Sequence, residues 1–166
     1  MRVEPLARAH ARASFRCGNA ELDDWFHHRA GQASLRSESA RTFLLVEDDR
    51  ILGFYSLAAF GVAADESPEE LLRGQPRYPV VPAVLLARLA IDASRQGEGL
   101  GTRLLADAIR RVIATTEHVA VVLVVVDALD ERAAVFYERH GFTRAPTGGR
   151  QRLVARVKDL RRSFGV

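Results

Sequence analysis

The feature that most constrains this fold is an apolar run from Ala83 to Asp92 that ends at a glycine-rich loop. A short, nearly continuous apolar run is typical of a central strand that is buried on both faces. After the loop, apolar residues recur at the spacing of a helix that packs on a core. These residues are Leu100, Leu104, Leu105, Ile109, Val112 and Ile113. A second apolar run at residues 120–126 completes the order strand, helix, strand, which predicts a right-handed βαβ unit.

The loop reads Ser94-Arg95-Gln96-Gly97-Glu98-Gly99-Leu100-Gly101-Thr102. Alternating glycines let the backbone approach a ligand, and the unpaired N–H groups at a helix start attract phosphate. A mononucleotide P-loop would need Lys and then Ser or Thr after Gly101, where Thr102 and Arg103 stand. The dinucleotide fingerprint would need a glycine at position 102. The remaining pattern is Q-x-x-G-x-G, which predicts a phosphorylated cofactor; an ordinary glycine-rich turn is the alternative.

Further strands and helices are expected around this unit. Asn19 is a candidate N-cap for a helix with Trp25 and Phe26 on its core face. The turn at residues 48–50 joins two apolar runs and predicts an antiparallel hairpin. The expected strands are residues 2–7, 41–47, 51–63, 142–144 and 150–157, and the expected additional helices are residues 69–73 and 127–139.

The length and composition fit one domain, residues 1–166, with a single substantial core. No apolar run is long enough to cross a bilayer, and residues 1–5 do not begin a signal peptide. We therefore expect a cytoplasmic protein with no membrane partner.

Metal and thiol chemistry are not expected. Cys17 is the only cysteine, so an internal disulfide is impossible, and no nearby pattern indicates an activated thiolate. The histidines lack the spacing of metal ligands, and no metal cofactor is predicted. They are His10, His27, His28, His118 and His140.

The basic residues are almost all arginine, and Lys158 is the single lysine. The formal net charge is +3 and the sequence pI is about 9.6. Arginine binds phosphate through two parallel hydrogen bonds, so this bias would suit an RNA or CoA partner. Codon usage in a GC-rich genome is the alternative explanation.

The order of elements and the Q-x-x-G-x-G loop resemble the GNAT N-acetyltransferases from about residue 3 to residue 157. In that family the loop binds the pyrophosphate of acetyl-CoA. Five further segments resemble one GNAT branch, the tRNA-acetylating toxins of type II toxin-antitoxin modules. These segments are Phe15-x-Cys17-Gly18-Asn19-x-x-Leu22-Asp23, Gly53-Phe54-Tyr55-Ser56-Leu57, Tyr78-Pro79-x-x-Pro82, Ala87-Arg88-Leu89-Ala90-Ile91-Asp92 and Phe136-Tyr137-Glu138-Arg139-His140-Gly141-Phe142.

The resemblance implies an α/β (α+β) GNAT fold, with a mixed, mostly antiparallel central sheet between helices on both faces and a βαβ acetyl-CoA-binding unit. It also implies direct acetyl transfer from acetyl-CoA to the α-amino group of an aminoacyl-tRNA. An α-amino group has a pKa of about 7.7 to 8.0, and the ester lowers it, so no strong protein base is required. A small ribbon-helix-helix type antitoxin and a homodimer are the implied partners.

The resemblance assigns Tyr137 as the catalytic acid that gives its proton to the departing CoA thiolate. The implied acetyl-CoA-binding residues are Leu89, Ala90, Ile91, Arg95, Gln96, Gly97, Gly99, Leu100, Gly101 and Thr102. Arg95 is expected to pair with a CoA phosphate, and Glu98 is expected to point to solvent. Residues expected to contact the acceptor tRNA are Arg29, Arg36, Arg41, Arg73, Arg77 and Arg88.

Alternatives remain open on the sequence alone. Phe136 and Tyr137 could be core aromatics, and Arg88 could be a salt-bridged strand residue instead of a cation that faces the acceptor. The protein could be a GNAT that acetylates a small amine or a protein N-terminus. It could also be a catalytically silent acyl-CoA-binding regulatory module.

Overall fold

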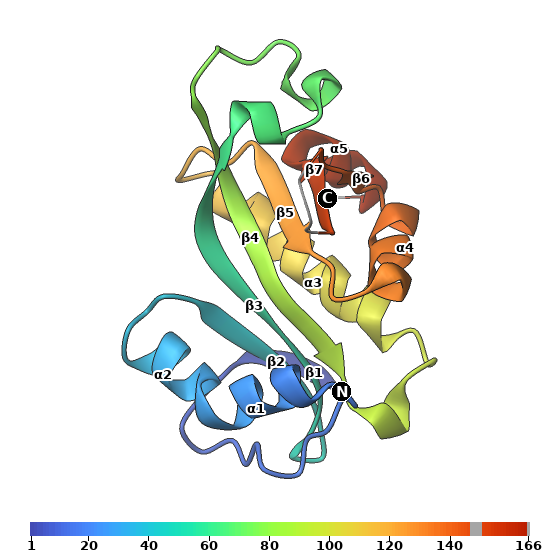
Figure 1. Ribbon diagram of the computed structural model, residues 1–166. Coiled ribbons are helices and arrows are strands. Elements are labelled where there is room, and N and C mark those ends of the chain that lie inside the picture. The colour runs from blue at the N-terminus through green and yellow to red at the C-terminus, as the bar shows by residue number, and fades with distance from the viewer. Residues whose placement is uncertain (147–150, 166) are drawn as a thin grey trace. The chain divides into compact units, whose positions relative to one another are not determined.

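The computed structural model describes residues 1–146 and 151–165 (Figure 1). Its strands are β1 (Arg2–Pro5), β2 (Arg41–Glu47), β3 (Arg50–Ala63), β4 (Val80–Ile91), β5 (Leu123–Asp127), β6 (Thr143–Arg144) and β7 (Arg152–Arg156). Its α-helices are α1 (Ala20–His28), α2 (Ala30–Leu35), α3 (Leu100–Thr115), α4 (Glu131–Arg139) and α5 (Val157–Ser163). Short 3-10 turns are η1 (Ala64–Glu66), η2 (Glu69–Leu72) and η3 (Ala93–Arg95).

The hydrogen-bonded strand order is β1-β2-β3-β4-β5-β7-β6. Neighbours β1 and β2, β2 and β3, β5 and β7, and β6 and β7 are antiparallel, whereas β4 and β5 are parallel. The predicted mixed, mostly antiparallel sheet is therefore confirmed. The parallel pair is the two strands joined through α3, as the predicted βαβ unit requires.

The chain divides into two compact units, and β3 and β4 each contribute residues to both. The first unit comprises Met1–Ala58 and Ala87–Ala108, and the second comprises Ala59–Leu86 and Ile109–Val166. In the first unit, Asp48 and Asp49 have φ angles of +47° and +63°, as a two-residue hairpin turn requires. Asn19 caps α1 through its Oδ1, which accepts a hydrogen bond from the Leu22 N–H at 2.9 Å.

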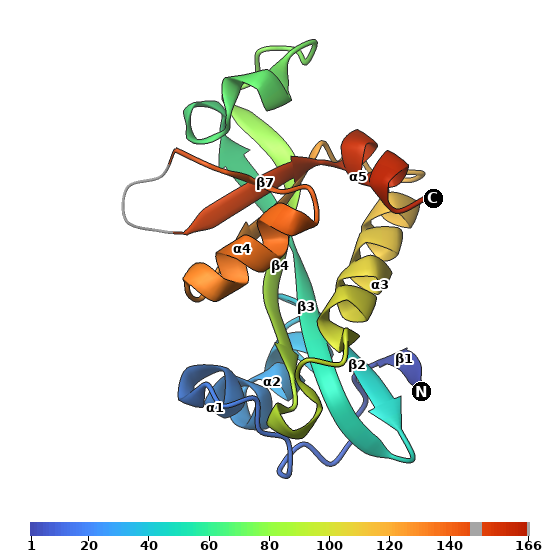
Figure 2. The same ribbon diagram turned by 90° about the vertical axis from the view of Figure 1, so that its right-hand side faces the viewer.

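Helices cover both faces of the strands in the first unit (Figure 2). Phe54 on β3 stacks on Phe26 of α1, with ring centroids 4.2 Å apart. Successive strand residues point to opposite faces, so the next residue, Tyr55, faces the other way. Its hydroxyl hydrogen-bonds to Asp107 of α3 at 2.5 Å. The two helices thus pack on β3 from opposite sides.

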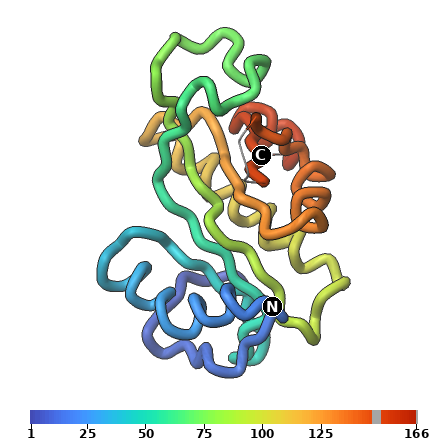
Figure 3. Tube along the Cα trace, in the orientation of Figure 1, coloured from blue at the N-terminus to red at the C-terminus, as the bar shows by residue number. Residues whose placement is uncertain are grey.

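The second unit has its own core, formed where β3, β4, β5 and β7 bring aliphatic side chains together. Its buried members are Val62, Val81, Ala83, Leu123, Val125 and Val154. Helices α4 and α5 pack against β7. The connection between β3 and β4, green in Figure 3, runs beyond the ends of both strands and carries η1 and η2.

The structure differs from the sequence predictions mainly at element ends. Strand β4 begins at Val80 instead of Ala83. Helix α4 begins at Glu131 because the Asp130 side chain caps it, accepting from the Ala133 N–H at 2.8 Å. The helix expected at residues 69–73 is a 3-10 turn. Helices α2 and α5 were not predicted, and the expected strand start at residue 150 lies outside the described residues.

Candidate functional site

The glycine-rich loop leaves β4 at Ile91 and enters α3 at Leu100. Gly97 and Gly99 have φ angles of +84° and +76°, which side-chain-bearing residues rarely adopt. A Cβ added at either glycine would meet no atom within 4 Å. The loop therefore presents exposed backbone to open space at the start of a helix, which is the arrangement that binds phosphate.

Asp92 holds the start of the loop. Its side chain is 8% exposed and accepts hydrogen bonds from the Ser94 hydroxyl at 2.6 Å and the Arg16 N–H at 3.3 Å. Burial alone would raise the pKa of Asp92, but these hydrogen bonds and the charge of Arg50 hold it below its ordinary value. Asp92 therefore stays ionised at neutral pH and fixes the turn that follows β4.

Gln96 braces the loop against the segment that precedes α1. Its Nε2 donates to the carbonyl oxygens of Cys17 at 2.8 Å and Ile91 at 3.1 Å. The Ala93 N–H donates to the Arg16 carbonyl at 2.7 Å. The Gln96 side chain was expected to surround the pyrophosphate, but in the structure it bonds to the protein backbone.

Arg95 is balanced by two carboxylates. Its Nη1 lies 2.8 Å from a Glu47 oxygen, and its Nε lies 2.8 Å from a Glu98 oxygen. The Glu98 side chain is 46% exposed, as expected of a residue that points to solvent, and pairing of Arg95 with a CoA phosphate stays a prediction. The ion pair with Arg95 partly offsets the repulsion that the Glu98 carboxylate would exert on a bound polyphosphate.

β3 approaches β4 closely at Ala90, within the segment expected to hold the thioester. A Cβ at Gly53 would lie 2.8 Å from the Ala90 carbonyl oxygen and 2.7 Å from Cδ1 of Ile91. Only glycine fits this position. The Ala90 side chain is buried, so any role for this residue in ligand binding falls to its main chain.

Tyr137 belongs to the second unit and lies on the buried face of α4, 7% exposed. Its ring makes edge contacts with Phe136 and Phe142, at centroid distances of 5.2 and 5.7 Å. Burial raises the pKa of Tyr137 far above its ordinary value. Within the described residues, no hydrogen bond to its hydroxyl is found. The phenol is therefore fully protonated at physiological pH, and its O–H group can donate a hydrogen bond to a ligand.

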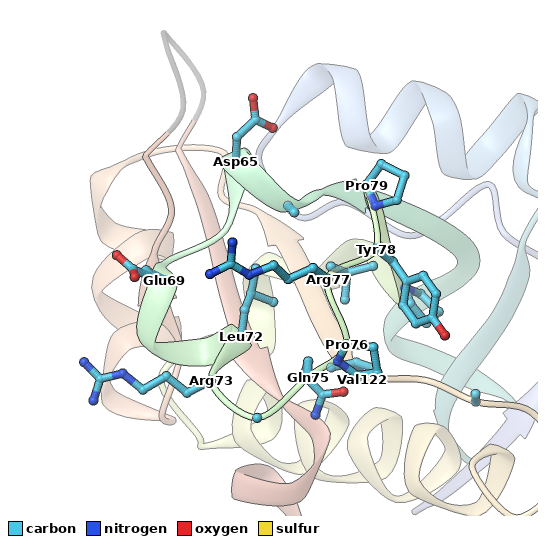
Figure 4. A pocket seen from close by; sticks show the side chains of 15 residues that line it. Asp65, Glu69, Leu72, Arg73, Gln75, Pro76, Arg77, Tyr78, Pro79 and Val122 are labelled. Carbon is cyan, nitrogen blue, oxygen red and sulfur yellow. The ribbon is translucent and has the colours of Figure 1, made fainter.

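The arginines expected to contact tRNA differ in their surroundings. Arg41 pairs with Glu38 at 2.9 Å, and Arg29 lies 3.8 Å from Asp24. Arg36 is exposed at the end of α2. In the second unit, Arg73 and Arg77 line a cavity of about 1010 Å³ beneath the loop between β3 and β4 (Figure 4).

Arg88 does not follow the first of the two interpretations drawn from the sequence, that of a salt-bridged strand residue. Its guanidinium carbon lies 3.9 Å from the centroid of the Trp25 ring, which is a cation–π contact. In the described part of the chain it forms no ion pair. The expectation of a salt-bridged strand arginine is therefore corrected: an aromatic face replaces the carboxylate.

Other chemistries have little support in the described residues. Burial raises the pKa of the Cys17 thiol to about 11, so it is not an activated nucleophile. Residues 1–146 and 151–165 contain no group of three or more His, Cys, Asp or Glu side chains placed to hold a metal ion. They also contain no helix long and apolar enough to cross a membrane.

Comparisons with known proteins agree with this geometry. The model of the acetyltransferase (GNAT) domain matches residues 38–144. A tRNA-acetylating toxin of Mycobacterium tuberculosis is 37% identical over 152 residues, which cover 92% of this chain and 89% of that protein.

Three solved structures of the AtaT–AtaR toxin–antitoxin system are also similar. AtaT complexed with acetyl-methionyl-tRNAfMet has a TM-score of 0.90 and 26% identity, covering 98% of both chains. AtaTR bound with AcCoA has a TM-score of 0.85 and 28% identity, covering 98% of this chain and 97% of that chain. A tyrosine-to-phenylalanine mutant of AtaT bound to the C-terminus of the antitoxin AtaR has a TM-score of 0.83 and 26% identity, covering 98% and 96%.

Proposed function

Because this chain belongs to the GNAT acetyltransferase family, we propose that it transfers the acetyl group of acetyl-CoA directly to the α-amino group of an aminoacyl-tRNA. The resulting N-acetylated aminoacyl-tRNA would be withdrawn from elongation, so the protein acts as a translation-inhibiting toxin. The observation that carries the donor half of this proposal is the pair of positive-φ glycines, Gly97 and Gly99, facing open space before α3. The acceptor half is supported by the tRNA-acetylating relative and by the AtaT–tRNA complex.

The loop fits the pyrophosphate of CoA. Backbone N–H groups of Gly97, Gly99 and Gly101, with those of Leu100 and Thr102, would hold the phosphates without any side-chain cation. Acetyl-CoA supplies an activated thioester. Main-chain groups of Leu89, Ala90 and Ile91 would hold its pantetheine arm and polarise its carbonyl.

Tyr137 would protonate the leaving group, which is the sulfur of CoA. Transfer forms a bond from the amine nitrogen to the acetyl carbon and breaks the bond from that carbon to sulfur. The nitrogen loses a proton and the sulfur gains one. Because burial raises the pKa of Tyr137, a free proton jump from the phenol to the thiolate would be uphill. Tyr137 therefore acts by hydrogen-bonding the sulfur and passing its proton only as negative charge develops there.

We further propose that the protein is a homodimer of single-domain chains in the cytoplasm, neutralised by a small ribbon-helix-helix type antitoxin. The AtaT complex with the AtaR C-terminus supports an antitoxin partner. Charged tRNA, the proposed acceptor, is a cytoplasmic substrate.

Gly99→Ala should weaken acetyl-CoA binding by about tenfold or more, because the backbone must leave the φ of +76° and misalign a charge-assisted hydrogen bond. Calorimetric titration with acetyl-CoA measures this change. Gly165→Ala is the matched control, since Gly165 has a φ of +65°, also with open space around it, but lies outside the loop. Equal affinities for the two variants would contradict the assignment of the loop.

The function is tested by offering purified protein and acetyl-CoA a panel of charged tRNAs, then free amino acids, aminoglycosides and peptides. When the aminoacyl group is then released from the tRNA, mass spectrometry should find that its amino group is acetylated. Comparable acetylation of the free amines, with charged tRNA left unmodified, would establish an ordinary small-molecule GNAT instead. Tight acetyl-CoA binding without turnover on any acceptor would establish a silent binding module.

A further inference from the structure

Arg88 lies at the end of a rigid aromatic stack in the first unit. Its guanidinium carbon is 3.9 Å from the centroid of Trp25. The Trp25 ring stacks on Phe54 at 6.0 Å with an interplanar angle of 20°, and Phe54 stacks on Phe26 at 4.2 Å and 7°. Phe15 closes the stack with edge contacts to both phenylalanines. All four rings are at most 8% exposed, so the guanidinium rests on a surface that cannot move away.

The guanidinium itself is left with unused donors. Arginine carries five N–H donors, and in residues 1–146 and 151–165 no acceptor is found for those of Arg88. Its nitrogens are nevertheless reached by solvent, since none is among the buried atoms without a partner. Burial lowers the pKa of Arg88, and the charges of Glu21 and Arg29 act on this pKa in opposite directions. Neither neutralises it by an ion pair.

This combination is unusual for a structural arginine. A partly buried guanidinium is normally paired with a carboxylate, because desolvation without a partner is costly. The flat contact with Trp25 offsets part of that cost and fixes the plane of the group, but it uses the face of the guanidinium, not its edge. The hydrogen-bonding edge stays open, in a fixed orientation suited to a planar, bidentate contact with an oxyanion.

The position of Arg88 on β4 indicates which oxyanion its guanidinium would bind. Arg88 immediately precedes Leu89, the first residue proposed to hold the thioester, so its backbone lies about 3.3 Å along the strand from that point. The reacting amine of an aminoacyl-tRNA is esterified to the terminal ribose. The phosphates nearest to it are those of the single-stranded 3′ end.

We propose that Arg88, held flat on Trp25, is an acceptor-positioning residue that binds a phosphate of the single-stranded 3′ end of the charged tRNA. This inference rests on the proposed function and adds the group of the acceptor that is bound. Because the stack orders the guanidinium before the substrate arrives, little entropy is lost on binding.

The test compares wild type with Arg88→Gln, Arg88→Lys and the exposed control Arg110→Gln on a charged tRNA that wild type acetylates. KM for this tRNA is measured at several salt concentrations, and acetyl-CoA affinity and thermal unfolding are measured in parallel. Arg88→Gln should raise KM for the tRNA by about 10- to 100-fold, the loss expected for one charge-assisted contact. The slope of log KM against log salt should fall by about 0.7, the value for one single-strand phosphate. Arg88→Lys should retain most of the salt slope, and Arg110→Gln should match wild type.

Several results would overturn the inference while leaving the proposed function intact. One is an unchanged KM in Arg88→Gln. Another is a raised KM with an unchanged salt slope and no rescue by lysine, which would indicate stacking of a nucleobase on the guanidinium. A third is a parallel loss of acetyl-CoA affinity and thermal stability in both variants, which would show a purely structural cation–π contact. If wild type acetylates no charged tRNA, the proposed function fails before any variant is compared.

Discussion

Tyr137→Phe should lower kcat by about 10²- to 10⁴-fold, the usual contribution of a positioned general acid. The substitution removes one oxygen from a ring whose packing against Phe136 and Phe142 is otherwise retained. Acetyl-CoA affinity should therefore stay close to that of wild type. Steady-state kinetics on charged tRNA and calorimetric titration with acetyl-CoA separate the two effects, and loss of toxicity on expression gives an independent readout.

The control for this prediction is Phe136→Leu, which alters a ring contact of Tyr137 in the same helix but leaves the phenol hydroxyl in place. The pH profile adds a second criterion. Because burial raises the pKa of Tyr137 far beyond its ordinary value, kcat of the wild type should show no fall caused by phenol ionisation near pH 10. Full activity in Tyr137→Phe would show that Tyr137 is a core aromatic residue without a catalytic role.

Phe54→Ala should lower the free energy of unfolding by about 3–5 kcal/mol, the range for truncating a fully buried phenylalanine. Phe54 is 0% exposed and touches the rings of Phe15, Trp25 and Phe26. Its removal leaves a cavity at the centre of the stack. Urea denaturation followed by fluorescence measures the loss, and Trp25, the only tryptophan, reports directly on this cluster.

Phe54→Leu is the matched control, because it keeps most of the apolar volume and removes the ring contacts. It should cost about 1.5 kcal/mol or more, because three aromatic pairs are lost at about 0.5–1.5 kcal/mol each. If the alanine and leucine variants unfold at the same urea concentration as wild type, the stack does not hold the first unit together. The support that it gives to Arg88 would then need another explanation.

The sequence predicts those parts of the fold that local rules determine. The Asn19 cap, the hairpin at Asp48 and Asp49 and the amphipathic pattern of α3 each depend on residues a few positions apart, and each is confirmed. Helix α5 was missed because its seven residues follow β7 directly and carry only two buried apolar side chains, Val157 and Leu160. So short a segment gives no clear helical period.

Roles of individual side chains depend on distant partners, and here the sequence was a poorer guide. Arg95 meets Glu47, and Gln96 meets Cys17, across 48 and 79 residues of chain. Arg88 meets Trp25, which no spacing rule connects to it. Sequence patterns place the loop and the strand correctly. They do not tell which polar groups already form hydrogen bonds or ion pairs within the protein before a ligand binds.

The hydrogen bonds between the loop and the segment before α1 have a thermodynamic consequence. Gln96 binds the Cys17 carbonyl, the Cys17 N–H binds Asp23 of α1, and Ala93 binds the Arg16 carbonyl. The loop and the start of the helix therefore order as one cooperative element. A ligand that immobilises the loop therefore stabilises α1 as well. By reciprocity, a partner that immobilises α1 increases the affinity of the loop for its ligand.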